Sequence, residues 1–297
     1  MTAGDTTTTT AATPGGPATA TVTRTPGAGT VYSVELGKLR GQPAVRAALA
    51  LVVVGPFVLA GGLSLQASVP ADTLFGRWSL TTGFAVPLLV LGFATSWVVP
   101  LLTCLVAGTI FSAEDGYGTW PTVLTRSVSR PAVFAGKVLA AVTWSVLSLV
   151  LLALSSLAAG VLIVGRAPLI GLDGASIATG RATGLVLASW ATCLVPALGY
   201  TAMGVFFSVL ARRSTVGVGA PVVIGLVMQL SSLVGAVTGV RFLLLGSAFD
   251  AWHALVRTDP YRGPVLQGAL VSVAYVLVLL AAALEIFRRR DESGARR

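Results

Sequence analysis

Six long stretches without Asp, Glu, Lys or Arg constrain this chain more than any other feature of its sequence, and together they hold more than half of its 297 residues. A helix needs about 20 apolar residues to cross a hydrocarbon core of about 30 Å. Each stretch is therefore long enough to cross a membrane once. The stretches are 47–71, 78–113, 138–165, 182–211, 214–240 and 263–284.

The fold class that follows is an all-α integral membrane protein. Charged residues make up only 10% of the chain, against about 25% in soluble domains, which argues against a soluble enzyme. An outer-membrane barrel would show strands of about 10 alternating residues instead of long apolar runs. We expect a six-span membrane domain over residues 44–290, with spans at about 46–66, 84–111, 134–164, 183–210, 215–239 and 264–287.

The two ends of the chain are polar and short of apolar residues. Residues 1–30 contain 12 Thr and cannot bury enough surface to fold, so we expect a disordered tail, and 291–297 form a second tail. With six spans, 14 Lys and Arg fall on the side of both termini and six on the other. The positive-inside rule predicts that both termini are cytoplasmic. Because the basic residues lie on loops, the net charge of +9 does not indicate a nucleic-acid partner.

Chemically reactive side chains are scarce in the spans. Intramembrane charges usually mark ion or proton pathways, and only Glu285, in the last turn of span 6, lies within one. The single histidine, His253, falls on an extracytoplasmic loop, while Cys104 and Cys193 fall inside spans. We expect no catalytic residue, no metal site and no cofactor bound by this chain.

A few hydroxyl and amide side chains lie in spans 3 and 5, and these are candidates for a substrate path. Such residues serve at least as often to join helices to one another, and the sequence leaves both interpretations open. The candidates are Thr143, Ser148, Gln229 and Ser232.

The loop between spans 2 and 3, residues 112–137, carries the most information. It combines an acidic pair, a flexible glycine pair and a basic flank. Residues 120–124 could form one or two helical turns, since Pro121 suits a first turn. The loop is either a docking surface for a cytoplasmic partner or a solvated linker. Its candidate residues are Glu114, Asp115, Gly118, Thr119, Leu124, Arg126, Arg130 and Lys137.

The order of these residues resembles the permeases of ABC exporters of the type 2 (ABC-2) class. That family has six spans, cytoplasmic ends and, after span 2, a Glu, a Gly-Thr, a Leu, a Pro-x-Ser-Arg element and a Gly-Lys that opens span 3. This chain departs from the pattern in having Ser127 before Val128, Ser129 and Arg130, with Pro131 after them.

The resemblance implies that the loop couples the permease to a separate ATPase, with Glu114 a candidate for a charge contact across that interface. It also implies an amphipathic interfacial helix before span 1, which residues 31–43 fit through Tyr32, Leu36 and Leu39 on one face. Short re-entrant pieces are expected over 242–256.

The chain lacks a phosphate-binding loop of its own, Gly-x-x-x-x-Gly-Lys-Ser/Thr, because Pro131 and Val138 stand where Gly and Ser or Thr are needed around Gly136 and Lys137. We therefore expect ATP and magnesium on a partner ATPase, a second permease half, identical or different, and contact with membrane lipid. The expected function is ATP-driven export of a hydrophobic or amphiphilic solute, such as a drug, lipid or natural product, from a bacterial cytoplasmic membrane. The alternatives are a stand-alone channel or carrier, and a non-transporting scaffold or immunity protein.

Overall fold

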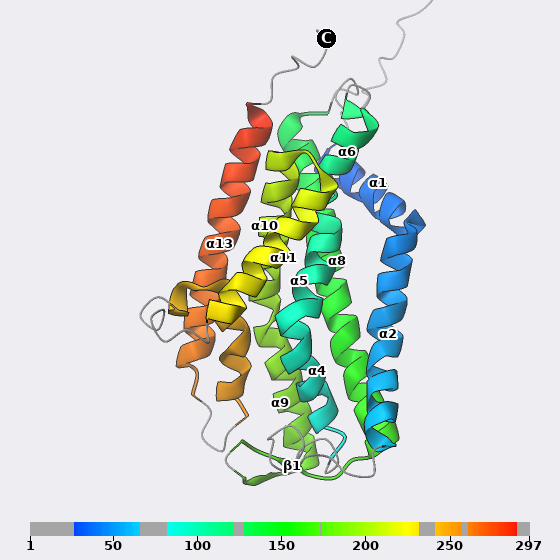
Figure 1. Cartoon of the computed structure of the whole chain (residues 1–297), viewed down its shortest axis with the longest axis vertical. Coiled ribbons are helices and arrows are strands. Elements are labelled where there is room, and N and C mark those ends of the chain that lie inside the picture. The colour runs from blue at the N-terminus through cyan, green and yellow to red at the C-terminus, as the bar shows by residue number, and fades with distance from the viewer. Residues whose placement is uncertain are drawn as a thin grey trace, which may run out of the picture.

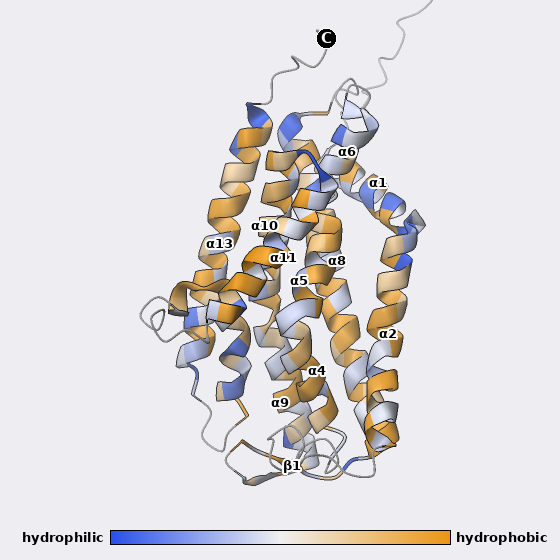
Figure 2. Ribbon diagram, in the orientation of Figure 1, coloured by the Kyte–Doolittle hydropathy of each residue, from blue (hydrophilic) through white to orange (hydrophobic). Residues whose placement is uncertain are grey.

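The computed structural model describes residues 27–65, 82–120, 128–172, 174–231, 241–256 and 261–289. Six helices in these ranges are long and apolar enough to cross a membrane. They run side by side in an elongated bundle, with a further helix lying obliquely at one end (Figure 1). Hydrophobic residues dominate the middle of the bundle, and the most hydrophilic residues lie mainly toward its ends (Figure 2).

The two ends of the bundle differ in structure. The α1 end carries helix α1 (Ala28–Gly41), the short helix α6 (Ser112–Tyr117) and the last turns of α13 (Gly263–Arg288). The hairpin end carries the antiparallel strands β1 (Leu169–Ile170) and β2 (Ser176–Ile177), which pair Leu169 with Ile177. Both described chain ends therefore lie at the α1 end, as six spans require.

Spans 1 and 2 differ in regularity. Helix α2 (Pro43–Ser64) is continuous despite Pro56 inside it. Span 2 consists of α4 (Ala85–Phe93), the π-helical turn η1 (Ala94–Val98) and α5 (Val99–Ala107). Pro100 has no N–H to donate to the carbonyl of residue 96, and residue 96 lies within the π turn. Span 2 is therefore locally widened where the regular hydrogen-bond ladder fails.

Spans 3 and 4 are the longest. Span 3 joins α8 (Arg130–Ala159) to the π turn η2 (Gly160–Val164), and span 4 joins α9 (Thr179–Thr192) to α10 (Leu194–Ala211). At 35 and 33 residues, each extends about 50 Å, well beyond a hydrocarbon core of about 30 Å. Span 4 is interrupted at Cys193, because Pro196 cannot donate to the carbonyl of Thr192.

Span 5 is α11 (Ser214–Ser231), and span 6 is α13. Three short helices described between them are η4 (Arg241–Leu243), α12 (Leu245–Ala248) and η5 (Phe249–Ala254). Leu245, Phe249 and Trp252 are buried against neighbouring spans. The segment expected to form short re-entrant pieces thus packs into the bundle, beside α13 (Figure 1).

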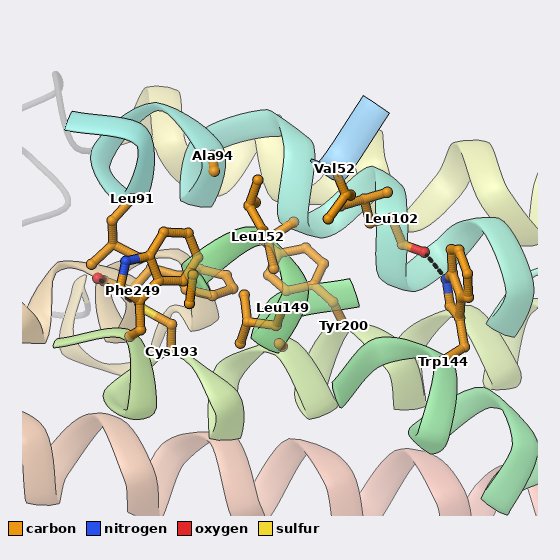
Figure 3. Close-up of a cluster of buried hydrophobic side chains, with 14 of the residues drawn as sticks. Val52, Leu91, Ala94, Leu102, Trp144, Leu149, Leu152, Cys193, Tyr200 and Phe249 are labelled. Carbon is orange, nitrogen blue, oxygen red and sulfur yellow. Dashed lines mark hydrogen bonds between the residues drawn. The ribbon is translucent and has the colours of Figure 1, made fainter. Parts of the chain in front are cut away.

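Helix α10 occupies the centre of the bundle, in contact with α5, α8, α11 and α13. Polar bonds cross between spans inside the apolar core: Trp144 Nε1 donates to the carbonyl of Leu102 over 2.6 Å (Figure 3), and the Ser145 and Thr201 hydroxyls lie 2.8 Å apart. Ser155 donates to the carbonyl of Val52 over 2.8 Å. These hydroxyl groups join helices, which is one of the two roles the sequence left open.

Several boundaries differ from those expected. Helix α1 begins at residue 28 instead of 31, α8 at 130 instead of 134, and α9 at 179 instead of 183. Apolar runs locate the membrane-embedded part of a helix, while polar turns at its ends escape that signal. The end of the expected disordered tail is wrong, because residues 28–30 belong to α1. The rest of that tail (1–26), the end of predicted span 5 (232–239) and the C-terminal tail (291–297) lie outside the described residues.

Candidate functional site

The candidate site is a buried charge cluster at the α1 end, centred on Lys137. This side chain is only 1% exposed, although it belongs to the second turn of α8. Its ammonium lies 3.0 Å from Glu35 Oε1, 3.1 Å from Glu114 Oε1 and 3.0 Å from the carbonyl oxygen of Ile110. All three N–H groups therefore have an acceptor, which a buried ammonium requires.

Glu114 connects α6 to this cluster. Lys38 Nζ lies 2.7 Å from its Oε1, which also accepts from Lys137, and the Thr119 hydroxyl donates to its Oε2. The chain can return to Glu114 so quickly because Gly118 ends α6 in the left-handed conformation, at φ 65°. The Glu and the Gly-Thr of the motif thus form one turn, which the hydrogen bond from Thr119 to Glu114 closes.

Helix α1 supplies the remaining charges. Glu35 and Lys38, one turn apart, form an ion pair of 3.0 Å. Gly136 lets α1 approach α8 closely, since a Cβ there would lie 2.6 Å from Val31 Cβ and 2.8 Å from the carbonyl oxygen of Ala28. Both residues of the Gly-Lys pair therefore hold α1 against α8. Gly136 allows the close backbone approach, and Lys137 forms an ion pair with Glu35.

Aromatic rings enclose the cluster. Phe111 lies 5.4 Å from Phe134 and 5.5 Å from Phe287, and Trp120 lies 5.4 Å from Phe287, measured between ring centroids. The Lys137 ammonium lies 5.8 Å from the Phe111 centroid and 5.9 Å from that of Trp120, within cation–π range. The rings exclude water and bring the end of α13 into the same assembly.

Two lysines and two glutamates make the cluster electrically balanced. Burial by itself would raise the pKa of Glu114, but the charge of Lys137 and the hydrogen bonds from Lys38, Thr119 and Lys137 lower it from 4.5 to about 2. Burial lowers the pKa of Lys38, and its bonds to Glu114 and Glu35 outweigh this, so the net pKa is raised. Both groups are firmly charged at neutral pH.

A comparison of the sequence with models of protein families identifies the family of this chain. The model of the ABC-2 family transporter proteins matches residues 32–231, from α1 to the end of α11. The chain belongs to the ABC-2 family. No curated protein matches the sequence. It is thus a multi-pass ABC-2 permease of the cytoplasmic membrane, and the cluster lies within the part that defines the family.

The residues of the permease loop divide into an inner and an outer set. Glu114, Thr119 and Lys137 point into the cluster. Arg130 donates to the carbonyl oxygen of Arg288 over 3.1 Å and so ties the start of α8 to the end of α13. On the outside of α6, Tyr117 is 83% exposed, and Asp115 is partly exposed. Leu124 and Arg126 lie outside the described residues.

Glu114 was expected to face a partner, yet both of its carboxylate oxygens are occupied within the chain. Glu35 and Lys38 were not among the candidates, although they are essential parts of the cluster. A signal existed: Lys38 and Lys137 are the only lysines of the chain, beside 18 arginines. Among the expected interfacial residues, Leu39 is buried, Leu36 is partly buried, and Tyr32 hydroxyl lies 3.0 Å from Thr143 Oγ1.

The three suggested substrate-path residues that the structure describes do not form a common lining within this chain. Thr143 pairs with Tyr32 of α1, and Ser148, about 140° away around α8, is buried and donates to the carbonyl of Ser145 over 3.1 Å. Gln229 faces α12 near Gly246. Ser232 lies outside the described residues.

Proposed function

We propose that this permease is the membrane subunit of an ATP-driven exporter, with the α1 end facing the cytoplasm and a separate ATPase docked there. The observation that carries the proposal is the convergence of the family motif residues Glu114, Thr119 and Lys137 on one buried cluster with α1. A cluster that joins a short surface helix to a membrane span is suited to transmit movement into the membrane.

The orientation rests on charge. At the α1 end, arginines lie at the ends of α1, α10 and α13, including Arg40, Arg212 and Arg288. Arg166, Arg181 and Arg262 lie toward the hairpin end. Together with the count over the whole sequence, this asymmetry supports a cytoplasmic α1 end.

The energy source is proposed to be a partner. The chain has two Gly-Lys pairs, and both lie inside helices, Gly37–Lys38 in α1 and Gly136–Lys137 in α8. The Lys137 ammonium is fully bonded to Glu35, Glu114 and Ile110. It has no donor left for a nucleotide phosphate. ATP and magnesium would bind to the ATPase subunit, whose closure on hydrolysis or binding would act on α6.

The outward side of α6 offers the contact. Tyr117 is a large, exposed aromatic beside Gly116, and tyrosine is enriched among the residues that dominate binding energy in protein interfaces. Glu114, directly behind it, would carry the force to Lys137 in α8 and to Lys38 in α1. In this mechanism Glu114 is a positioning residue, and Tyr117 makes the contact.

The cargo is proposed to be apolar or amphiphilic. Hydroxyl groups inside the bundle, such as Ser145, Thr201 and Ser155, are bonded to other helices and offer no countercharge or hydration shell to an ion. Desolvating an ion without such partners is costly. We place the path between two permease halves, since the polar groups within one half are directed to each other.

Reconstitution with the ATPase tests the proposal. Vesicles containing the permease and its ATPase should accumulate an amphiphilic dye in the direction away from the ATPase, only with hydrolysable ATP. An ATPase variant that binds but does not hydrolyse ATP should abolish this transport. Dye or ion flux through the permease alone, independent of ATP, would contradict the proposal and support a channel or carrier.

A further inference from the structure

A second site lies at the hairpin end, far from the charge cluster, where span 3, α9 and the turn before α4 line an open-sided cavity of about 360 Å³. Its walls are mostly apolar. Leu154, Leu157 and Ala158 line it from α8, Val161 lines it from η2, and Phe84 lines it from the turn before α4. The four residues of span 3 follow the spacing i, i+3, i+4, i+7 and therefore form one continuous face of that span.

The cavity is built on a fixed backbone. Gly83 N donates to the carbonyl of Gly165 over 3.1 Å, and the Thr82 hydroxyl donates to the carbonyl of Ala167 over 2.5 Å. Gly83 and Gly160 are in such close contact that neither has space for a Cβ. Residues 82–83, before α4, are thus held against residues 165–167, after η2, by two hydrogen bonds.

A single cation stands at one end of this apolar face. Gly165 adopts φ 114°, which ends η2 and turns the chain sharply. Arg166 follows it, exposed to its surroundings, and lines the cavity together with Thr179 and Thr183. Within the part of the chain that the structure describes, no carboxylate pairs with its guanidinium. It is also the first charged residue after Lys137.

The hydroxyl groups of Thr179 and Thr183 are not available to donate to a bound anion. Thr179 donates to the carbonyl of Arg166 over 3.3 Å, and Thr183 donates to the carbonyl of Thr179 over 3.1 Å. Their hydroxyl protons are used within the wall. Recognition of an anion at this end of the cavity therefore falls to Arg166, whose planar guanidinium suits a phosphate oxygen pair.

The dimensions of the face match one lipid leaflet. From Leu154 to Val164 the helix rises about 15 Å, which is half of a hydrocarbon core of about 30 Å. Leu154 is 51% exposed, so the face opens sideways toward the bilayer. Its apolar part lies at the depth of an acyl chain, and Arg166 lies at the level where a headgroup would begin.

We propose that this cavity binds one acidic phospholipid from the leaflet at the hairpin end, with an acyl chain along Leu154, Leu157 and Val161 and the phosphate on Arg166. The site is separate from the coupling of the permease to an ATPase. Its occupant fills the junction of spans 2, 3 and 4 and stabilises it. The inference does not depend on the proposed function.

Lipid titration of the purified full-length permease tests the site. Thermal unfolding is followed in neutral detergent while phosphatidylglycerol or phosphatidylcholine with the same acyl chains is added. We expect a saturable rise in unfolding temperature with phosphatidylglycerol at a concentration at least about fivefold lower than with phosphatidylcholine. In Arg166→Gln the two lipids should become about equally effective, a loss of about fivefold or more, which is within the net contribution of one hydrogen bond.

Arg262→Gln is the matched control, since Arg262 is exposed before α13 but does not line the cavity. It should retain the preference for phosphatidylglycerol, and Arg166→Lys should retain part of it. Equal responses to both lipids, or equal losses in the two Gln variants, would overturn the proposal. So would an equal stabilisation by inorganic phosphate, which would indicate a free-anion site. Ala158→Trp, which fills the cavity, should remove the saturable response.

Discussion

The ammonium of Lys137 lies 3.0 Å from Oε1 of Glu35, a residue 102 positions earlier in the chain. This pair holds helix α1 against α8 at a depth that water scarcely reaches. Because the same Glu35 oxygen and Glu114 Oε1 also contact Lys38, no one charge of the cluster can be removed without leaving another uncompensated.

Lys137→Met should therefore destabilise the permease severely. It leaves Glu35 and Glu114 facing each other with only the partly exposed Lys38 between them, and breaking a buried ion pair costs about 3 to 5 kcal/mol. Thermal unfolding of the detergent-solubilised protein measures the loss. Adding Glu35→Gln to Lys137→Met should cost less than the two separate losses combined; strictly additive effects would show that the pair does not act as a unit.

The contribution of Glu114 should depend on pH in one direction. The fold lowers its pKa from 4.5 to about 2, so the ionised form favours the folded state. Its stabilisation is complete above pH 4.5 and is lost as the pH falls toward 2. The stability difference between the wild type and Glu114→Gln should be constant from pH 7 to 5 and shrink below that. A difference that already disappears at pH 5.5 would contradict this assignment.

Gly136→Ala should displace α1. The added Cβ would meet Val31 Cβ at 2.6 Å and the carbonyl oxygen of Ala28 at 2.8 Å, and overpacking of this kind costs about 1 to 3 kcal/mol. We expect faster hydrogen exchange of the α1 amides with the six spans intact. Gly116→Ala is the control, because nothing lies within 4 Å of its Cβ; equal effects in the two variants would refute the close-approach argument.

Tyr117→Ala should separate docking from folding. The side chain is exposed at the α1 end and contributes little to the core, so the unfolding temperature should stay within about 1 °C, in line with the small effects of surface substitutions. Binding of the ATPase should weaken about tenfold or more if Tyr117 anchors the interface. Tyr261→Ala, an exposed tyrosine near the opposite end of α13, should leave ATPase binding unchanged.

The proposed orientation makes a labelling prediction. In a background without Cys104 and Cys193, Arg262→Cys should react with a membrane-impermeant maleimide added outside intact cells, while Arg213→Cys should react only after lysis. Both positions are exposed. The opposite pattern would place the α1 end outside and would remove the basis for ATPase docking there.

Long uncharged runs were sufficient to predict the six spans, because the cost of a charge in hydrocarbon separates spans from loops. The cluster could be predicted only in part. The sequence indicates Glu114, Thr119 and Lys137 as a motif, but the partners Glu35 and Lys38 come from a helix 76 to 102 residues away. Pairing over that distance is decided by how α1 lies on α8, which local periodicity does not contain.

Prolines show the same limit, since the sequence alone does not tell which proline in a span interrupts its helix. Pro56 and Pro221 lie inside continuous helices, whereas α9 ends at Thr192, four residues before Pro196. A missing hydrogen bond is accommodated or becomes a break according to what neighbouring helices offer. Whether a proline interrupts a helix therefore depends on tertiary packing, which the sequence pattern does not show.

The two lysines of the cluster also decide how this subunit responds to amine chemistry. The side chain of Lys137 is 1% exposed and that of Lys38 is 46% exposed, and the chain has no other lysine. In the folded permease, Lys38 is then the one side-chain amine that an amine-directed fluorophore or cross-linker can reach. Apart from reaction at the α-amino group, such a reagent reports on α1, and release of Lys38 from Glu35 and Glu114 during transport would register as a rise in its reactivity.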